Sequence, residues 1–293
     1  MMVRHLALLF VLALIWGSSF LAIKIGVETI PPLTLAAGRV VFAAVLLWGV
    51  ARMQGLTLPR GGRMWFYCFL IGIMGNGLPF TLINWGEEKI DSGLAAILMA
   101  VMPLMTVVLA HFFTVGDRMS PAKLLGVAFG FAGVIILVGP EALKGLGGDV
   151  WRQLATSGGA ICYGIAAILT RNMPAAPLLA RSAGVMIAAS IVMLPLSLAF
   201  DAPWALSPST DALIAGAYLG LFPTAVATII LFHLLKSRSA SFVAPINYLI
   251  PVFGVLWGIA VLGEQVSPRA LAALSVILIG MAIAQYRPRG AAS

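Results

Sequence analysis

Long apolar segments alternate with short polar segments along the whole chain of 293 residues. A membrane-spanning α-helix needs about 20 mostly apolar residues, with a range of about 17–25. Ten such windows occur, and the polar segments between them are too short to form a soluble domain. The pattern therefore predicts an all-α polytopic membrane protein whose ten transmembrane helices occupy residues 6–27, 33–51, 64–85, 92–114, 121–138, 154–170, 179–200, 211–232, 241–262 and 268–286.

The composition supports this class, because 61% of the residues are hydrophobic, 10% are charged and the mean hydropathy is +1.05. Soluble domains carry about 25% charged residues, and a surface this apolar would aggregate in water. Most soluble enzymes are thereby excluded, and the net charge of +8 does not indicate a nucleic-acid-binding surface. Cys68 and Cys162 lie inside apolar windows, so they do not form a disulfide framework.

The charged residues are divided unevenly between the two sides of the membrane that these spans define. Twelve of the 18 Lys and Arg residues fall on the side that holds both termini, with a single acidic residue, Asp117. The other nine acidic residues fall on the opposite side. Because Lys and Arg concentrate in cytoplasmic loops, we expect both termini to lie in the cytoplasm.

The chain repeats itself at an offset of about 147 residues. This offset divides the chain into halves of five spans each, residues 1–147 and 148–293. Five is an odd number, so the second half starts on the opposite face of the membrane, which is the inverted repeat common in secondary transporters. The matched pairs include Trp16-Gly17 with Tyr163-Gly164, Lys24 with Arg171, Gly116-Asp117 with Gly263-Glu264, and Ser120-Pro121 with Ser267-Pro268.

These residues resemble those of the drug/metabolite transporter superfamily, in its ten-span branch built from two EamA-type repeats. The resemblance covers essentially the whole chain, and Asp117 stands where glutamate is more usual. It implies a multi-pass transporter of a bacterial-type inner membrane, most similar to the amino-acid exporters, the aromatic amino-acid exporter among them. The matching segments are Trp16-Gly17-Ser18-Ser19-Phe20, Lys24, Pro31-Pro32 and Arg39 in the first half, and Tyr163-Gly164 and Arg171 in the second.

Two aromatic residues, Trp16 and Tyr163, lie near the middle of their spans, and each precedes a glycine. Most tryptophans of membrane proteins lie at the membrane interface instead. Glycine permits close approach of another helix or a ligand. We therefore expect both aromatics to line a substrate cavity near the midplane, and packing between helices is the alternative.

Lys24 and Arg39 are the two basic residues drawn into spans. Charge inside a membrane is costly and often functional. One interpretation is that they anchor a substrate carboxylate. The other is that they form a structural cluster with Glu28 that joins the first two helices.

Further cavity candidates are polar or adaptable side chains at helical spacing. Asn76, Phe80 and Asn84 follow each other at four-residue intervals and share one helix face. The alternative for the amides is hydrogen bonding between helices, because polar groups in lipid need partners. The other candidates are Met99, Tyr218, Phe222, Asn247 and Tyr248, with Pro103 and Pro251 as gating bends or as static kinks.

The functional prediction rests on what the spans contain. All ten carboxylates lie in loops or at span ends, whereas exporters of lipophilic cations depend on a buried acid. The sequence therefore favours a facilitated or weakly coupled exporter that moves amphiphilic or zwitterionic solutes by alternating access. We expect aromatic and other neutral amino acids as substrates. Exchange of other organic anions or nucleotide sugars, multidrug export and a role in membrane-protein assembly are the alternatives.

Several kinds of chemistry are not expected. The chain has no GxxxxGK[ST] phosphate loop, and it has none of the GxSxG, HExxH or paired-aspartate motifs of intramembrane enzymes. We expect no catalytic residue, metal site or cofactor, and no nucleic-acid partner. Because one chain already holds both halves, we expect a monomer in the lipid bilayer.

Overall fold

The computed structural model describes residues 2–113, 119–138, 148–237, 240–243 and 245–285, and these residues form helices joined by short connections. Eight helical stretches are long and apolar enough to cross a membrane, and two shorter apolar helices accompany them. The first half contains α1 (Met2–Gly26), α2 (Pro32–Met53), α3 (Gly62–Gly72), η1 (Ile73–Gly77), α4 (Leu78–Glu87), α5 (Ser92–Met99), α6 (Met102–Phe113) and α7 (Pro121–Val138). The second half contains α8 (Gly148–Asn172), α9 (Leu178–Phe200), η3 (Pro203–Ala205), α10 (Thr210–Leu219), η4 (Gly220–Val226), α11 (Ala227–Ser237), α12 (Ala240–Val243), α13 (Ile246–Leu262) and α14 (Pro268–Gln285).

The predicted all-α membrane fold is confirmed, and the spans fall on the predicted windows. The third window, 64–85, corresponds to the continuous helical stretch Gly62–Glu87. The fourth window is interrupted at Ala100–Val101, between α5 and α6, and the ninth is divided between α12 and α13. Residue 114 of the fourth window, residue 244 of the ninth and residue 286 of the tenth lie outside the described residues.

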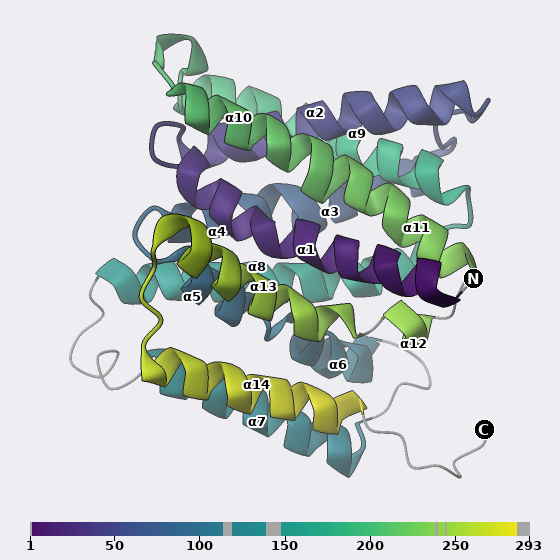
Figure 1. Ribbon diagram of the computed structural model, residues 1–293. Coiled ribbons are helices and arrows are strands. Elements are labelled where there is room, and N and C mark those ends of the chain that lie inside the picture. Colours follow the sequence, from purple (N-terminus) through teal and green to yellow (C-terminus); the bar gives the residue numbers. More distant parts are fainter. Residues whose placement is uncertain (1, 114–118, 139–147, 238–239, 244, 286–293) are drawn as a thin grey trace.

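The helices of the two halves pack against each other in pairs (Figure 1). In that view α7 and α14 lie together at the bottom, α2 and α9 lie together near the top, and α1, α4, α8 and α13 lie between them. The α7–α14 contact depends on glycine, because a Cβ atom at Gly126 would lie 2.4 Å from the carbonyl oxygen of Gly280. The glycines on this face of α7 therefore permit a close helix contact.

The two ends of the bundle differ in charge. The first turn of α1 and the last turn of α14 lie at the same end (Figure 1), which also holds Arg52 and Arg63 and is called the basic end below. The opposite end holds Glu28, Glu87 and Asp91 and is called the acidic end. Helix α1 begins at the basic end and α8, its counterpart at the 147-residue offset, begins at the acidic end (Figure 1).

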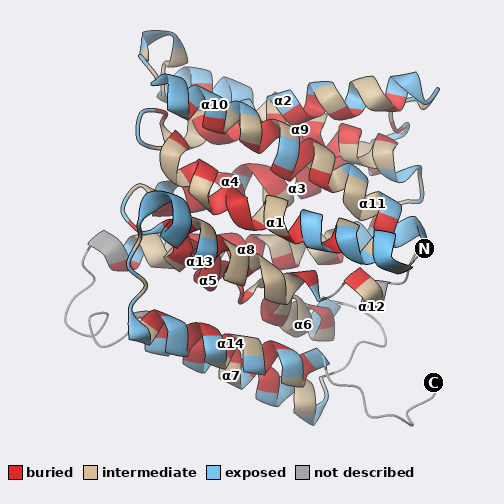
Figure 2. Ribbon diagram, in the orientation of Figure 1, coloured by how far each residue is buried: buried red, intermediate tan, exposed pale blue. Residues whose placement is uncertain are grey.

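Burial follows the expectation for a protein surrounded by lipid. Buried residues lie on the faces that helices turn toward each other, and exposed residues lie on the outer faces (Figure 2). Many of the exposed side chains are large and apolar, such as Ile135, Phe200 and Ile214. In water such a surface would be a liability, whereas in a bilayer it contacts acyl chains.

Two π-helical segments interrupt the third and eighth spans at matching positions. η1 begins at Ile73 and η4 begins at Gly220, which is the repeat offset of 147 residues. A π-helix replaces i→i−4 hydrogen bonds by i→i−5 bonds, and such segments are frequent at functional sites. Neither segment was predicted from the sequence, and both reach the cavity described next.

Candidate functional site

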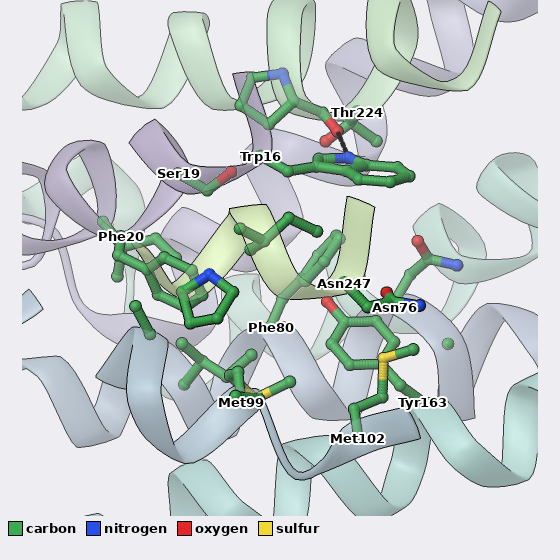
Figure 3. Close-up of a pocket in the computed structure, with 18 of the residues that line it drawn as sticks. Trp16, Ser19, Phe20, Asn76, Phe80, Met99, Met102, Tyr163, Thr224 and Asn247 are labelled. Atoms are coloured by element: carbon green, nitrogen blue, oxygen red, sulfur yellow. Dashed lines mark hydrogen bonds between the residues drawn. The ribbon is translucent and has the colours of Figure 1, made fainter. Parts of the chain in front are cut away.

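A cavity of about 320 Å³ lies at the middle of the spans, between the two halves of the chain (Figure 3). Its volume is at the lower end of the range of about 300–1,000 Å³ for small-molecule sites. Aromatic and apolar side chains form most of the wall, with a few polar groups among them. The first half contributes Trp16, Ser19, Phe20, Ile23, Arg39, Gly75, Asn76, Phe80, Ile83, Ala96, Met99, Ala100, Met102 and Pro103, and the second half contributes Tyr163, Met186, Pro223, Thr224, Thr228, Asn247, Ile250 and Pro251.

Of the described residues, Arg39 is the one charged residue in this wall. Its side chain is almost fully buried, and its Nε donates a hydrogen bond of 2.8 Å to Oγ1 of Thr224. The guanidinium lies over the Phe80 ring, with Cζ 3.7 Å from the ring centroid, which is a cation–π contact. These two contacts hold Arg39 from opposite halves of the sequence and leave its terminal nitrogens available.

The π-helix η4 positions Thr224 for this contact. The Thr224 hydroxyl donates to the carbonyl oxygen of Leu219, five residues earlier, at 2.8 Å. Because the hydroxyl proton is used there, the Thr224 oxygen is free to accept from Arg39. The signal for this residue in the sequence is only the neighbouring Pro223 in the middle of a span, and sequence reasoning missed Thr224.

Trp16 links the two halves at the same depth. Its indole Nε1 donates to the carbonyl oxygen of Pro223 in η4, at 3.0 Å (Figure 3). Its repeat counterpart Tyr163 packs edge-on against Phe80, with ring centroids 6.4 Å apart. Both mid-span aromatics therefore line the cavity, and their contact with a solute remains a prediction.

Four polar side chains in the cavity wall have no hydrogen-bond partner among the described residues. They are the amides of Asn76 and Asn247 and the hydroxyls of Tyr163 and Thr228, and Figure 3 labels the first three of these residues. Buried polar groups are normally satisfied. These groups are consequently available to a solute or to water.

Of the predicted site residues, nine lie in the cavity wall: Trp16, Arg39, Asn76, Phe80, Met99, Pro103, Tyr163, Asn247 and Pro251. Lys24 does not, and its Nζ instead donates to the carbonyl oxygens of Glu87 and Ile90, each at 2.8 Å. The structure thus places Lys24 in a link between α1 and the end of α4. This corrects the pairing of Lys24 with Arg39 as one anchor, because only Arg39 reaches the cavity.

Four other candidates also lie outside the cavity wall. Asn84 donates to the carbonyl oxygen of Pro32 at 2.9 Å. Its amide therefore forms a hydrogen bond between helices, which was the alternative to lining the cavity. Tyr218 forms a 2.6 Å hydrogen bond with Ser18 and packs against Phe222, whose side chain is exposed on the outer surface. Tyr248 is partly buried and packs against the hydrophobic core.

The two prolines predicted as paired bends differ in their surroundings. Pro103 lies in the first turn of α6, directly after the break at Ala100–Val101. Pro251 lies inside the continuous helix α13. The two positions are therefore not equivalent bends, although both contact the cavity.

The acidic end contains a second polar cluster outside the cavity. Glu87 is fully buried, and among the described residues neither of its carboxylate oxygens has a hydrogen-bond partner. Lys24, Glu264 and Arg39 lie within electrostatic range of Glu87. Burial and the negative charge of Glu264 raise the pKa of the nearby Asp91, and Lys24 opposes this shift. The sequence placed Glu87 at a span end and did not indicate its burial.

Hydrogen bonds between the halves also gather at the acidic end. Glu264 accepts from the backbone N–H groups of Ser92 and Gly93, and Asp201 accepts from the backbone N–H and the hydroxyl of Thr34. The described side-chain hydrogen bonds between halves lie at this end or near the cavity. Among all the residues that the structure describes, no three His, Cys, Asp or Glu side chains come together as metal ligands would.

The fold and the site define a multi-pass membrane protein with a central cavity between two halves. Comparison with known proteins supplies the class. The model of the EamA-like transporter family matches residues 4–139 and again residues 151–285. The chain belongs to this family, within the drug/metabolite transporter superfamily, and it is a membrane transporter.

Individual relatives agree with this assignment. The chain is 29% identical over 279 residues to the "Uncharacterized inner membrane transporter YedA" of Escherichia coli strain K12, covering 94% of this chain and 88% of that protein. It is 28% identical over 281 residues to the "Probable terminal-alkyne amino-acid exporter" of Streptantibioticus cattleyicolor, covering 94% and 91%. A solved crystal structure with 20% identity has a TM-score of 0.69 over 96% of both chains, which supports the fold.

Proposed function

We propose that this transporter exports amino acids, aromatic and other neutral ones, and related small metabolites by alternating access, with the solute bound in the central cavity. The observation that carries the proposal is the combination in one cavity wall of a buried Arg39, several aromatic rings and unpartnered amides. A guanidinium suits a carboxylate because it offers paired N–H donors. The rings and methionines suit an apolar side chain of varied shape.

The surroundings of the cavity support an arrangement in which the two halves rock about the solute. The wall is shared between the halves, and Trp16–Pro223 and Arg39–Thr224 are the hydrogen bonds that cross it. Solute binding between two halves near the midplane is the geometry that alternating access requires. The relative named as an amino-acid exporter adds support for the solute class.

The energy source and the orientation belong to the same proposal. No Asp or Glu among the described residues lines the cavity, which favours facilitated or weakly coupled transport over a proton–cation exchange at a shared acid. The basic end would face the cytoplasm of an inner membrane, following the distribution of Lys and Arg. A single chain supplies both halves, so a monomer is sufficient.

The nucleotide-sugar alternative is less well supported. Several cations would be needed around a diphosphate, whereas the cavity wall holds one arginine. One positive charge matches one carboxylate. A multidrug-cation exporter fits less well still, because Arg39 would repel the cation.

The experiment is uptake of labelled tryptophan, phenylalanine and leucine into proteoliposomes, with and without an imposed pH gradient. We expect saturable uptake that changes little with the gradient and is lost in Trp16→Ala. Trp204→Ala is the matched control, because Trp204 is exposed in η3, away from the cavity. Absence of uptake for every amino acid would refute the solute assignment, and gradient-driven accumulation would refute the weak coupling.

A further inference from the structure

The cavity is unbalanced in charge, and this bears on which parts of a solute it recognises. Arg39 contributes a positive charge, and among the described residues no acidic side chain lines the wall. The buried carboxylate of Glu87 lies within electrostatic range of Arg39 but outside the wall, and the two form no ion pair. The guanidinium is buried, yet among the described residues its hydrogen bonding is limited to the bond from Nε to Thr224. A buried charge without an ion-pair partner is costly in a protein interior. The cavity therefore favours an anionic group.

The geometry directs that group to one edge of Arg39. Thr224 occupies the Nε side at 2.8 Å, and the Phe80 ring covers one face at 3.7 Å. The terminal nitrogens remain, and two N–H donors on these nitrogens suit a carboxylate bound through both oxygens. Thr224 is itself held by its hydrogen bond to Leu219 in the π-helix. Arg39 is thus positioned before a solute arrives.

Among the described residues of the wall, no carboxylate is available to an ammonium group. The neutral side-chain acceptors there are the amide oxygens of Asn76 and Asn247 and the hydroxyls of Ser19, Tyr163, Thr224 and Thr228. These groups hydrogen-bond an amine or a water equally well, because an amide presents both donors and acceptors. An ammonium in the same small cavity would also be repelled by Arg39. An α-amino group can therefore be accommodated, but it adds little to binding.

We propose that the cavity recognises the carboxylate and the apolar body of its solute and does not require an α-amino group. Its substrate class then includes aryl-substituted monocarboxylates, which lack the amine, alongside neutral amino acids. This inference rests on the proposed function, because it concerns the same cavity. It differs by naming the carboxylate as the obligatory group.

The test compares three solutes that share a phenyl ring: phenylalanine, 3-phenylpropionate and 2-phenylethylamine. Binding to the purified full chain and uptake into proteoliposomes are both measured. We expect the dissociation constant of 3-phenylpropionate to lie within about threefold of that of phenylalanine, and binding of 2-phenylethylamine to be at least tenfold weaker. Uptake should follow the same order.

The possible results separate this inference from the proposed function. Transport of phenylalanine without binding of 3-phenylpropionate would overturn the inference and leave the proposed function intact. Transport of 3-phenylpropionate without phenylalanine would support the inference and refute amino-acid export. Binding of 2-phenylethylamine as tight as that of 3-phenylpropionate would overturn the inference, and binding of none of the three would overturn both.

Variants of Thr224 test how Arg39 is held. Thr224→Val removes the acceptor of the Nε hydrogen bond, so we expect at least tenfold weaker binding of 3-phenylpropionate, with recovery to within threefold in Thr224→Ser. Thr170→Val is the matched control, because the Thr170 hydroxyl donates to the carbonyl oxygen of Ala166 within α8 and Thr170 does not line the cavity. Equal binding in Thr224→Val and Thr170→Val would overturn the positioning role. If Thr224→Val does not fold, Arg39→Lys replaces it and should weaken carboxylate binding in the same way.

Discussion

The connection between the halves at the acidic end depends strongly on Glu264. This residue follows Gly263, which ends α13 with a left-handed φ of +66° and turns the chain back. Its two carboxylate oxygens accept hydrogen bonds from the backbone N–H groups of Ser92 and Gly93, at 2.7 and 2.9 Å. Glu264→Gln keeps the size of the side chain and replaces one acceptor oxygen by an amide NH₂ group.

The magnitude follows from these two bonds. The remaining oxygen of the glutamine can accept from one N–H group, while the NH₂ group faces the other N–H as a second donor. Loss of a hydrogen bond to a charged group costs about 1.5–3 kcal/mol, and loss of a negative charge at a helix N-terminus costs a further ~0.3–1 kcal/mol. The sum of about 2–4 kcal/mol corresponds to roughly 30- to 700-fold in the equilibrium between joined and separated acidic ends, at about 1.4 kcal/mol for each tenfold.

The assay is chemical labelling from the acidic end. Met99 lines the cavity, so a Met99→Cys variant, made after replacing the native Cys68 and Cys162, reports access of a membrane-impermeant maleimide. We expect Glu264→Gln to raise the labelling rate at least tenfold. Glu28→Gln is the matched control, because Glu28 is exposed at the same end. Equal labelling rates in the two variants, with equal melting temperatures, would refute the reasoning.

Three further predictions concern stability in detergent, measured as melting temperatures of the purified protein. Gly126→Ala should lower the free energy of unfolding by about 1–3 kcal/mol through overpacking, because its Cβ would lie 2.4 Å from the Gly280 carbonyl oxygen. An unchanged melting temperature would contradict the close helix contact. Lys24→Met should lower the free energy of unfolding by about 3 kcal/mol, because two hydrogen bonds from a charged group are lost, and it should leave the dissociation constant of the solute unchanged. Weaker solute binding in this variant would instead indicate that Lys24 anchors the carboxylate. For Asp91 the raised pKa means that the folded state holds the proton more tightly, so stability falls as the pH rises past the ordinary value of about 3.9. Asp91→Asn should therefore be more stabilising at pH 7 than at pH 4, and the reverse order would contradict the assigned surroundings.

The cavity residues differ in how far the sequence could predict them. Trp16 and Tyr163 were identifiable because an aromatic residue in the middle of a span departs from the usual interfacial position. Arg39 was identifiable because a charged side chain inside a span is costly and therefore often functional. Lys24 carried the same signal at a similar depth, and only the structure shows that it bonds to backbone carbonyl oxygens instead.

The stripe of Asn76, Phe80 and Asn84 shows the limit of periodicity. Phe80 and Asn84 share one face of the regular helix α4, and Asn76 precedes them in the π-helix η1. Asn76 and Phe80 line the cavity, while Asn84 lies closer to the acidic end and bonds to Pro32. Whether an amide meets a solute or another helix depends on the neighbour it faces.

The sequence by itself determined the class of protein, the ten spans, the internal repeat and the mid-span aromatics. These properties depend on local composition and on comparison of one segment with another, because each span must satisfy its backbone and match the bilayer thickness on its own. The tertiary structure decided which helices pair, where the π-segments fall and how Glu87 is buried. It also brought Thr224, 185 residues away along the chain, to the guanidinium of Arg39. Such contacts depend on the rotation of each helix against distant neighbours, which the pattern within one span does not specify.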